Sequence, residues 1–258
     1  MADPLVLVEQ QDGIATVTLS DPPKRNAFSK RMREELVEVF TTLNADPECR
    51  AIVLTGAGGT FCSGGDISEM EQRTQMVARA RLVVVTDLAR LLLTGAKPIV
   101  AAIEGAAMGA GLTMAAACDY VVTASDARLC FAFARVGLLP DTCAYWIVPR
   151  RVGLAKAQEL FALARTFDAA EAHRIQLVNE VVEPGTALER ARAVAREYAA
   201  MPPVTTAILR GVFAQGFTSL EAAAQFELVG QPLMQKTADH AEAVAAFRAK
   251  RKPEFKGD

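Results

Sequence analysis

The sequence lacks an excess of charge of either sign and a long hydrophobic run. Its 28 Lys and Arg residues nearly balance its 30 Asp and Glu residues, so the net charge is −2 and the pI is near 5.9. This balance gives no general attraction to nucleic acid or to an anionic membrane, and an anionic ligand would need locally placed basic groups. No uninterrupted apolar stretch reaches membrane-spanning length. We therefore expect neither nucleic acid nor a membrane among its partners.

Paired cysteines and nucleotide-binding loops are also missing. The five cysteines form no CxxC pair and are odd in number: Cys49, Cys62, Cys118, Cys130 and Cys143. This pattern is typical of reduced thiols, not of a disulfide framework or a zinc site, so no metal is expected. Met1–Pro4 lacks the basic and apolar regions of a signal peptide. Gly56–Gly59 matches neither GxGxxG nor the P-loop lysine pattern. We expect a soluble, cytoplasmic protein that binds no dinucleotide or ATP.

Short apolar runs alternate with helical periodicity in the first half of the chain. Runs at Leu5–Val8 and Ile14–Leu19 flank Asp12-Gly13, a strong hairpin signal. Wholly apolar runs, as expected for strands buried on both faces, follow at Ala51–Leu54, Ile99–Ile103 and Tyr120–Thr123. Helices are predicted over Lys30–Leu43, Ile67–Leu93 and Ala106–Cys118. The alternation predicts a layered α/β domain.

Strand signals nearly disappear after Gly153, and helical patterns broken by prolines and glycines fill the rest of the chain. The predicted helices cover residues 155–164, 169–175, 187–200, 204–215, 219–236 and 238–250. A chain of 258 residues is long enough for one sizeable core with a smaller appendage. We place an α/β core domain at residues 1–200 and a helical C-terminal region at residues 201–258.

Two turns rich in small residues are the most informative feature of the chain. Phe61–Asp66 reads FCSGGD, and Gly105–Gly111 reads GAAMGAG, each after an apolar strand-like run. Glycine and alanine allow a backbone to approach a ligand closely. Two such turns can bring two bare N–H groups to one point, where they stabilise negative charge developing on a carbonyl oxygen. As a pair, the turns predict an oxyanion hole.

In this order and after these strands, the two turns resemble those of the crotonase (enoyl-CoA hydratase/isomerase) superfamily. The other segments that carry the resemblance are Pro22–Ser29, Ala51–Gly56, Lys97–Gly105, Val136–Asp141, Pro149–Gly153 and Phe247–Lys250. The resemblance covers nearly the whole chain. It implies an α/β fold with a ββα spiral core, a helical C-terminal region for trimerisation, and an acyl-CoA substrate. The expected assembly is a homotrimer or a hexamer, and coenzyme A is expected as part of the substrate, with no separate cofactor.

The same resemblance assigns roles to individual residues. The backbone N–H groups of Gly65 and Ala110 would bind the thioester oxygen; alanine is permitted there because only its main chain is used. Coenzyme A would be contacted from the first loop, the first turn and the last helix, by Lys24, Arg25, Ser63, Asp66, Ile67, Phe247 and Lys250. Surface solvation remains the alternative for Lys24 and Arg25, and a helix N-cap is the alternative for Asp66.

The positions of the superfamily's acid/base residues favour a reaction other than hydration. Hydratases carry two glutamates, because adding water requires one group to activate it and one to deliver a proton. The corresponding residues here are Thr113 and Phe133, and neither can act as a base. A conventional hydratase mechanism is therefore poorly supported.

Asp141 is the remaining candidate base. It follows Leu138-Leu139-Pro140 in a loop where single-acid isomerases of the superfamily carry an acidic residue. One carboxylate suffices to remove a proton α to the thioester and return it at γ. Burial among apolar side chains would raise its pKa and strengthen it as a base; the expected neighbours are Phe131, Phe133, Leu138 and Leu139. A helix N-cap is the alternative role.

Several hypotheses about the function of this protein stay open. The leading one is an enoyl-CoA isomerase acting on a Δ3–Δ2 or ring-derived acyl-CoA; the others are an atypical hydratase, a non-catalytic CoA-binding homologue and, weakest, an RNA-binding protein. Asp141-Thr142 also resembles the nucleophile of 4-chlorobenzoyl-CoA dehalogenases. Their partner tryptophan and histidine are replaced here by Phe133 and Arg90, so dehalogenation is disfavoured.

One local departure from the family pattern concerns Gln176. Glycine is usual at this position, before a Leu-Val-Asn run, where a helix ends in a left-handed residue. We expect glutamine to rearrange the helix end without affecting the chemistry.

Overall fold

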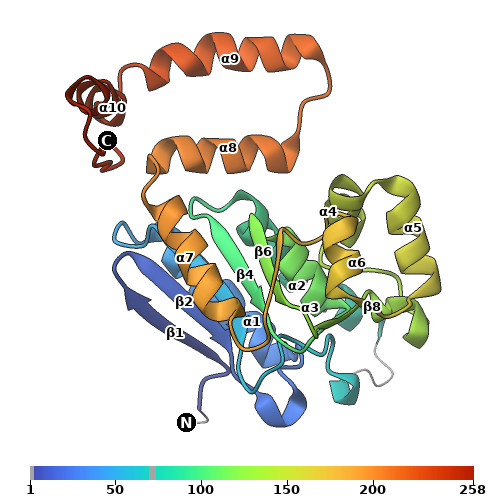
Figure 1. Cartoon of the computed structure of the whole chain (residues 1–258). Helices are drawn as coiled ribbons and strands as arrows, with labels where there is room; N and C mark the ends of the chain where they lie inside the picture. The colour runs from blue at the N-terminus through green and yellow to red at the C-terminus, as the bar shows by residue number, and fades with distance from the viewer. Residues whose placement is uncertain (1–2, 70–73) are drawn as a thin grey trace.

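A computed structural model of the chain describes residues 3–69 and 74–258 (Figure 1). Within these residues, strands form a six-stranded sheet in the order β1-β2-β3-β4-β6-β9 and a three-stranded sheet in the order β5-β7-β8. The strands are β1 (Val6–Gln11), β2 (Ile14–Leu19), β3 (Ala51–Gly56), β4 (Ile99–Ile103), β5 (Ala106–Met108), β6 (Tyr120–Ala124), β7 (Arg128–Cys130), β8 (Phe167–Asp168) and β9 (Glu180–Val182).

The helices enclose these sheets and continue beyond them into the C-terminal part of the chain. They are α1 (Lys30–Ala45), α2 (Gln75–Thr94), α3 (Ala110–Ala117), α4 (Ala144–Val152), α5 (Leu154–Leu163), α6 (Ala169–Arg174), α7 (Ala187–Ala199), α8 (Pro203–Gln215), α9 (Leu220–Met234) and α10 (Ala238–Ala249). Short 3₁₀ turns are η1 (Pro22–Lys24), η2 (Ile67–Glu69) and η3 (Ala132–Val136). In the described part of the chain, no helix combines the length and apolar character needed to cross a bilayer.

The larger sheet begins with the predicted hairpin and continues in parallel. Asp12 and Gly13 both have positive φ, 51° and 76°, as the favoured two-residue hairpin turn requires. Strands β1 and β2 pair antiparallel, and the remaining neighbours in this sheet pair parallel. The β3 and β4 runs are apolar on both faces because both faces are covered. The hairpin and the three predicted inner strands are confirmed.

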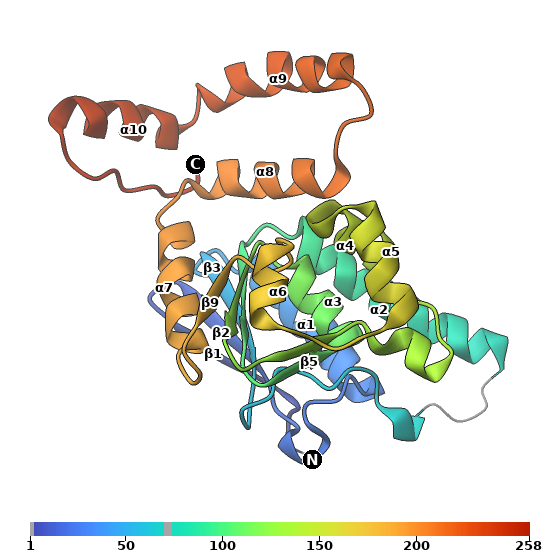
Figure 2. The same ribbon diagram turned by 45° about the vertical axis from the view of Figure 1, so that its right-hand side comes forward.

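The two faces of this sheet pack against different layers. Helix α7 covers one face, where Ala187, Ala191 and Ala195 allow close approach to the valines and alanines of β3, β4 and β6. The other face carries the main core, which includes Leu36 and Phe40 of α1 and reaches α2, α3 and the smaller sheet. Figures 1 and 2 show α7 on its own side of the sheet, with α1, α2 and α3 on the other.

The structure corrects three predicted elements. The segment Ile67–Leu93 is not one helix: η2 ends at Glu69, and α2 begins only at Gln75 after a Thr74 N-cap. Residues 70–73 of that prediction lie outside the described part of the chain. Ala106–Met108 is a strand, because its backbone pairs with β7, and the helix starts only at Ala110. Strands β8 and β9 also lie in the half predicted to be helical.

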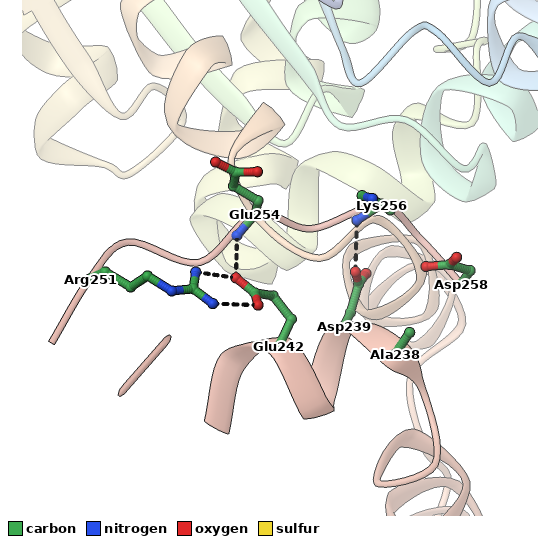
Figure 3. Close-up of a pocket in the computed structure, with 7 residues that line it drawn as sticks. All are labelled: Ala238, Asp239, Glu242, Arg251, Glu254, Lys256 and Asp258. Carbon is green, nitrogen blue, oxygen red and sulfur yellow. Dashed lines mark hydrogen bonds and ion pairs between the residues drawn. The ribbon is translucent and has the colours of Figure 1, made fainter. Parts of the chain in front are cut away.

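Helices α8, α9 and α10 extend from the core as an arm (Figures 1 and 2). The predicted boundary between residues 200 and 201 falls between α7 and α8. After α10 the chain turns back along that helix (Figure 3). The Asp239 carboxylate, which is buried, accepts the backbone N–H groups of Lys256 at 2.7 Å and Gly257 at 3.0 Å. Arg50 of the core donates to the Phe255 carbonyl at 2.9 Å, so the terminal segment ties the arm to the core.

The end of α6 keeps its usual geometry despite the glutamine. Gln176 has φ 63°, in the left-handed region. Its N–H bonds the His173 carbonyl at 2.9 Å, and the Leu177 N–H bonds the Ala172 carbonyl at 2.9 Å. These are the two hydrogen bonds of a Schellman motif. The expected rearrangement of this helix end is therefore wrong: the backbone is retained, and the glutamine bears the cost of a left-handed conformation.

Replacing this residue should recover that cost. Gln176→Gly should stabilise the protein by about 0.5–1 kcal/mol, because a Cβ in the left-handed region costs about 1–2 kcal/mol and part of the gain is offset by the freedom of glycine in the unfolded chain. The measurement is the denaturant midpoint with an unchanged m-value. Gln176→Ala, which keeps the Cβ, is the control and should give no such gain. Equal midpoints for Gly and Ala variants would show that the backbone is unstrained.

Candidate active site

The two small-residue turns lie side by side because their backbones pair in parallel. Cys62 and Ala107 form a β-bridge, in which the Cys62 N–H donates to the Ala106 carbonyl at 3.0 Å and the Met108 N–H donates to the Cys62 carbonyl at 2.9 Å. Beyond this bridge Gly64 lies against Met108, and the next residues of the two turns include Gly65 and Ala110. The juxtaposition predicted from two separate turns therefore has a direct cause in backbone pairing.

Glycine is required at two points of this contact. Gly64 has φ 89°, and a Cβ there would lie 2.9 Å from the Met108 carbonyl oxygen. A Cβ on Gly111 would lie 2.6 Å from the Cys62 Cβ. Real Cβ atoms do not approach other atoms this closely, so a side chain at either position would push the turns apart.

Gly65 and Ala110 both line a cavity of about 90 Å³. Ala110 is the first residue of α3, so its N–H has no partner within the helix. Among the hydrogen bonds of the described residues, none uses the N–H of Gly65 or of Ala110. The positive end of α3 also points to this place. Two donors without acceptors at the wall of one cavity have the arrangement that an oxyanion requires.

Asp141 lines the same cavity, from the loop between η3 and α4. Its side chain is 16% exposed, and its Oδ1 accepts the Thr142 hydroxyl at 2.9 Å. Helix α4 begins at Ala144, and its N-terminus has no side-chain cap, so the alternative role of Asp141 as an N-cap is wrong. The structure thus brings together the three residues predicted to carry the chemistry.

The backbone after Asp141 is strained. Thr142 and Cys143 both have φ 58°, a conformation that is unusual for any residue with a side chain and most so for the β-branched threonine. Such residues cost about 1–3 kcal/mol each and persist where the surroundings fix them. Thr142 is buried. Its burial and its hydrogen bond hold the carboxylate against the cavity.

Burial raises the pKa of Asp141 above its ordinary value. The hydrogen bond from Thr142 and the positive charges of Arg81 and Arg33 act in the opposite direction. Burial is the larger effect, as expected for a carboxyl beside Phe133. Not all of the predicted neighbours contribute, because Leu138 is 44% exposed and Leu139 is 79% exposed. Leu139 was wrongly expected to bury the carboxyl.

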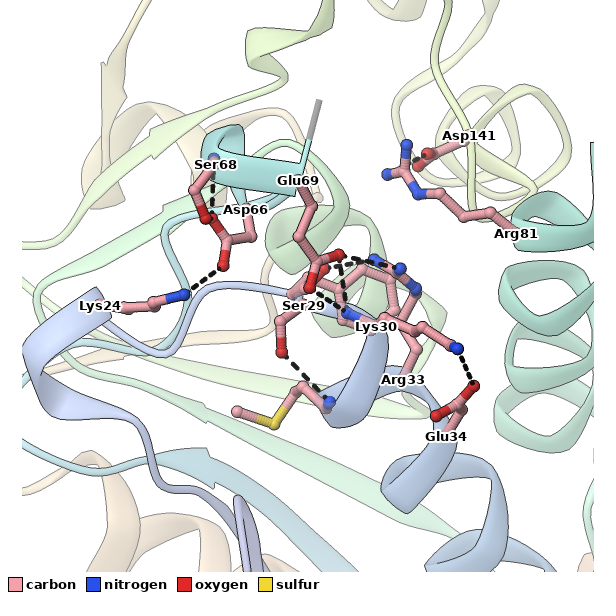
Figure 4. Close-up of polar contacts among 12 residues, drawn as sticks. Lys24, Ser29, Lys30, Arg33, Glu34, Asp66, Ser68, Glu69, Arg81 and Asp141 are labelled. Atoms are coloured by element: carbon pink, nitrogen blue, oxygen red, sulfur yellow. Dashed lines mark hydrogen bonds and ion pairs between the residues drawn. The ribbon is translucent and has the colours of Figure 1, made fainter. Parts of the chain in front are cut away.

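Arg81 is a cavity residue that the sequence analysis missed. It comes from α2, and its Nη2 lies 3.7 Å from Asp141 Oδ2 (Figure 4). In the sequence it is one of several arginines mixed with acids along a predicted helix. Arg81 precedes the buried Leu88 by seven residues, and residues with this spacing lie on the same face of a helix. This spacing is the signal that Arg81 faces inward.

The residues predicted to contact coenzyme A divide into three groups. Ser63 and Ile67 line the cavity itself. Lys24 and Arg25 lie next to the first turn, where the Ser63 N–H donates to the Arg25 carbonyl at 3.0 Å and the Ser63 hydroxyl to the Lys24 carbonyl at 3.2 Å. Phe247 lies on the arm and is 85% exposed. Lys250 follows the same helix, and neither arm residue is among the described residues that line the cavity.

Asp66 is held by a lysine and by the turn that follows it (Figure 4). Lys24 Nζ lies 2.8 Å from its Oδ2, and its Oδ1 accepts the Ser68 N–H at 2.9 Å and the Ser68 hydroxyl at 2.6 Å. The hydrogen bond from Lys24 lowers the pKa of Asp66, and the pKa of Lys24 is raised by the same contact. The bond to Ser68 caps η2, as the N-cap alternative predicted. Lys24 is half exposed and keeps donors available to a ligand.

Other polar residues near the turns have structural partners. Glu69 accepts the Lys30 N–H with both carboxylate oxygens at 2.9 Å, and its Oε2 lies 3.3 Å from Nη2 of Arg33. Thr113 is buried and donates its hydroxyl to the Gly109 carbonyl at 3.1 Å. Burial raises the pKa of the Cys62 thiol to about 12, so it is not a nucleophile at neutral pH.

The residues that a dehalogenase would need are elsewhere. Phe133, which the resemblance aligns with the tryptophan, lines the cavity. Arg90 is exposed and pairs with Asp87 at 2.9 Å. Trp146 donates its indole N–H to the Ala214 carbonyl of α8 at 2.8 Å. The cavity therefore offers no aromatic-histidine partnership for a nucleophilic Asp141 among the described residues that line it.

Known proteins are similar to this chain in sequence and in fold. The family model described as enoyl-CoA hydratase/isomerase matches residues 9–258. The chain is 32% identical to the 1,2-epoxyphenylacetyl-CoA isomerase of Escherichia coli K12, over 98% of each chain. It is also 32% identical to the short-chain-enoyl-CoA hydratase of Clostridium acetobutylicum, over 96% of each chain. A crystal structure of an enoyl-CoA hydratase from Mycobacterium smegmatis superposes with a TM-score of 0.92, at 30% identity, covering 98% of this chain and 99% of the other. The protein belongs to the enoyl-CoA hydratase/isomerase family, the crotonase superfamily, and has its fold.

Proposed function

We propose that this protein is an enoyl-CoA isomerase that moves a double bond by means of one carboxylate. The observation that carries the proposal is the composition of the cavity: Asp141 is the one carboxylate among the described residues that line it. Thr113 and Phe133, which the family resemblance aligns with the hydratase glutamates, are buried and supply no base. One base fits a proton shuttle better than the addition of water, which needs two groups.

The proposed reaction proceeds in two proton transfers. Asp141 removes a proton from C2 of a 3-enoyl-CoA, and the electron pair of the C–H bond delocalises into a dienolate. The N–H groups of Gly65 and Ala110 stabilise the charge on its thioester oxygen. The carboxyl group then returns the proton to C4, which leaves the double bond between C2 and C3. The carboxylate is regenerated, and no water or cofactor is consumed.

A short linear acyl group is the first substrate to test. A short linear 3-enoyl-CoA has no ring to accommodate, so ring-type substrates of the isomerase branch come second in the order of testing. The cavity wall is largely apolar, with Ile67, Phe133 and Val136 among its residues, as suits a hydrocarbon chain.

We also propose that the active protein is a homotrimer or a hexamer. Large apolar side chains are exposed along the arm, including Phe213 of α8, Leu228 of α9 and Phe247 of α10. A lone soluble chain rarely exposes so many. Phe247 and Lys250 could then contact coenzyme A bound to a neighbouring copy.

Asp141→Asn tests the proposed base. Conversion of a short 3-enoyl-CoA to the conjugated 2-enoyl-CoA should fall by about 10²–10⁴-fold in kcat, because the amide cannot accept the proton. The rate is followed by the absorbance of the conjugated thioester, and binding of the substrate by calorimetry should persist. Asp87→Asn is the matched control, since Asp87 is also paired with an arginine of α2 but is half exposed.

Two results would contradict the isomerase. Formation of a 3-hydroxyacyl-CoA from a 2-enoyl-CoA, unaffected by Asp141→Asn, would indicate a hydratase with other acid/base groups. Saturable binding of acyl-CoA without turnover of either substrate would indicate a non-catalytic homologue.

Ala110→Pro tests the oxyanion donor without changing a side-chain charge. Proline lacks the N–H and is tolerated at the first position of a helix, so kcat should fall by about 10²–10³-fold while the fold is kept. Leu154→Pro is the matched control, because Leu154 is likewise the first residue of a helix after a glycine N-cap. Comparable kcat values for the two proline variants, with intact thermal unfolding, would remove Ala110 from the site.

The pH dependence should reveal a base with a raised pKa. Asp141 acts when deprotonated, so kcat/KM should fall as pH decreases through its pKa in the free enzyme. Since burial raises that pKa, the acid limb should lie above the ordinary aspartate value of about 3.9. The measurement is kcat/KM for the 3-enoyl-CoA against pH. An acid limb at or below the ordinary value would show that burial does not control this carboxyl.

A further inference from the structure

Arg81 occupies an unusual position for an arginine. It belongs to the walls of two cavities: the one that contains the oxyanion donors, and one of about 280 Å³ between α1 and α2. Its side chain is 21% exposed and approaches Asp141, with 3.7 Å between Nη2 and Oδ2. That separation is too long for a hydrogen bond, so the two groups interact through their charges.

The guanidinium group is also poorly satisfied. Its Nε–H is buried and has no hydrogen-bond partner among residues 3–69 and 74–258. Arg210 shows what a structural arginine of this chain looks like: its Nε lies 2.8 Å from both carboxylate oxygens of Asp119, and its other nitrogens donate to the carbonyls of Gly95 and Leu92. A buried N–H without a hydrogen bond costs free energy, although the Arg81 side chain as a whole is 21% exposed. Hydrogen bonding therefore does not explain why Arg81 lies here, whereas the attraction between its charge and the Asp141 carboxylate does.

We propose that Arg81 is the positioning residue of the base: its positive charge keeps Asp141 ionised inside the apolar cavity and drives the proton from the carboxyl group to the substrate. The inference rests on the proposed isomerase function. The same charge favours the carboxylate before the first proton transfer and again after the second. It thus opposes the one state in which the proton would remain trapped on Asp141.

Besides Arg81, three other groups lie near the Asp141 carboxylate. Arg33 of α1 adds a second positive charge, but it is bonded at 2.6 Å to the Phe28 carbonyl and 3.3 Å from Glu69. Thr142 donates a hydrogen bond to the carboxylate. Burial raises the pKa of the nearby Cys143 thiol; the charge of Arg90 lowers it and the charge of Asp141 raises it by smaller amounts, so the thiol stays neutral. Arg81 is the cation in direct contact with the carboxylate, as Figure 4 shows.

The test compares Arg81→Gln and Arg81→Lys with Arg79→Gln. Arg79 lies on the exposed side of the same helix, so its replacement removes the same charge away from the cavity. The first readout is the titration of the Asp141 carboxyl carbon by NMR in the free enzyme, assigned with Asp141→Asn. The second is the pH profile of kcat/KM for the 3-enoyl-CoA. Arg81→Met provides a second neutral variant in case Arg81→Gln does not fold.

Loss of the charge should move both readouts to higher pH. We expect Arg81→Gln to shift the titration midpoint of Asp141 and the acid limb of kcat/KM upward by about one pH unit or more, because an opposite charge at this range stabilises a carboxylate by that amount or more. Arg81→Lys should stay near wild type, and Arg79→Gln should match it. Activity of Arg81→Gln should recover as pH rises, with little change in KM.

An unchanged titration midpoint in a folded Arg81→Gln or Arg81→Met protein would overturn the inference. So would a loss of activity that is equal at all pH values, since that is the mark of a merely structural residue. The NMR titration requires no turnover. A shifted midpoint in a protein that isomerises no enoyl-CoA would therefore support the charge coupling and contradict the proposed function.

Discussion

The parallel pairing of two short backbone segments is the constraint on which the site depends. Cys62 and Ala107 form one bridge, and the two turns that follow it contain Gly65 and Ala110, which line one cavity. The pairing is possible because Gly64 and Gly111 lack a Cβ, which at either position would collide with atoms of the other segment. The smaller sheet holds the second turn in place, since β5 pairs with β7. The proposed oxyanion donors are thus positioned by backbone contacts, which require no side-chain ordering when a substrate binds.

A second constraint is the balance of charge around Asp141. The apolar wall raises its pKa, which makes it a stronger base but lowers the fraction that is ionised. Arg81 and Arg33 act in the opposite direction, and the strained residues Thr142 and Cys143 fix the carboxyl in place. Burial and positive charge must be matched. Burial alone would keep the carboxyl protonated, whereas positive charge alone would give a carboxylate too weak to remove a carbon-bound proton.

Much of the fold could be predicted, because its signals are local. The β1–β2 hairpin follows from Asp12-Gly13, and the inner strands follow from apolar runs that only burial on both faces explains. The errors arise where pairing overrides local pattern. Ala106–Met108 has a helical composition but becomes a strand because β7 lies beside it. Gln176 was expected to change a helix end, whereas the two hydrogen bonds of the Schellman motif keep it in the left-handed conformation.

The site divides in the same way between local and distant information. Gly65, Ala110 and Asp141 were identified because each lies in a short motif, and they do line one cavity. Arg81 lies in no motif, and its partner is sixty residues away along the chain. Its role arises only when α2 packs across α1 and turns one of several arginines inward. Sequence patterns therefore located three residues that line one cavity, whereas the charged side chain beside them depends on how the helices pack.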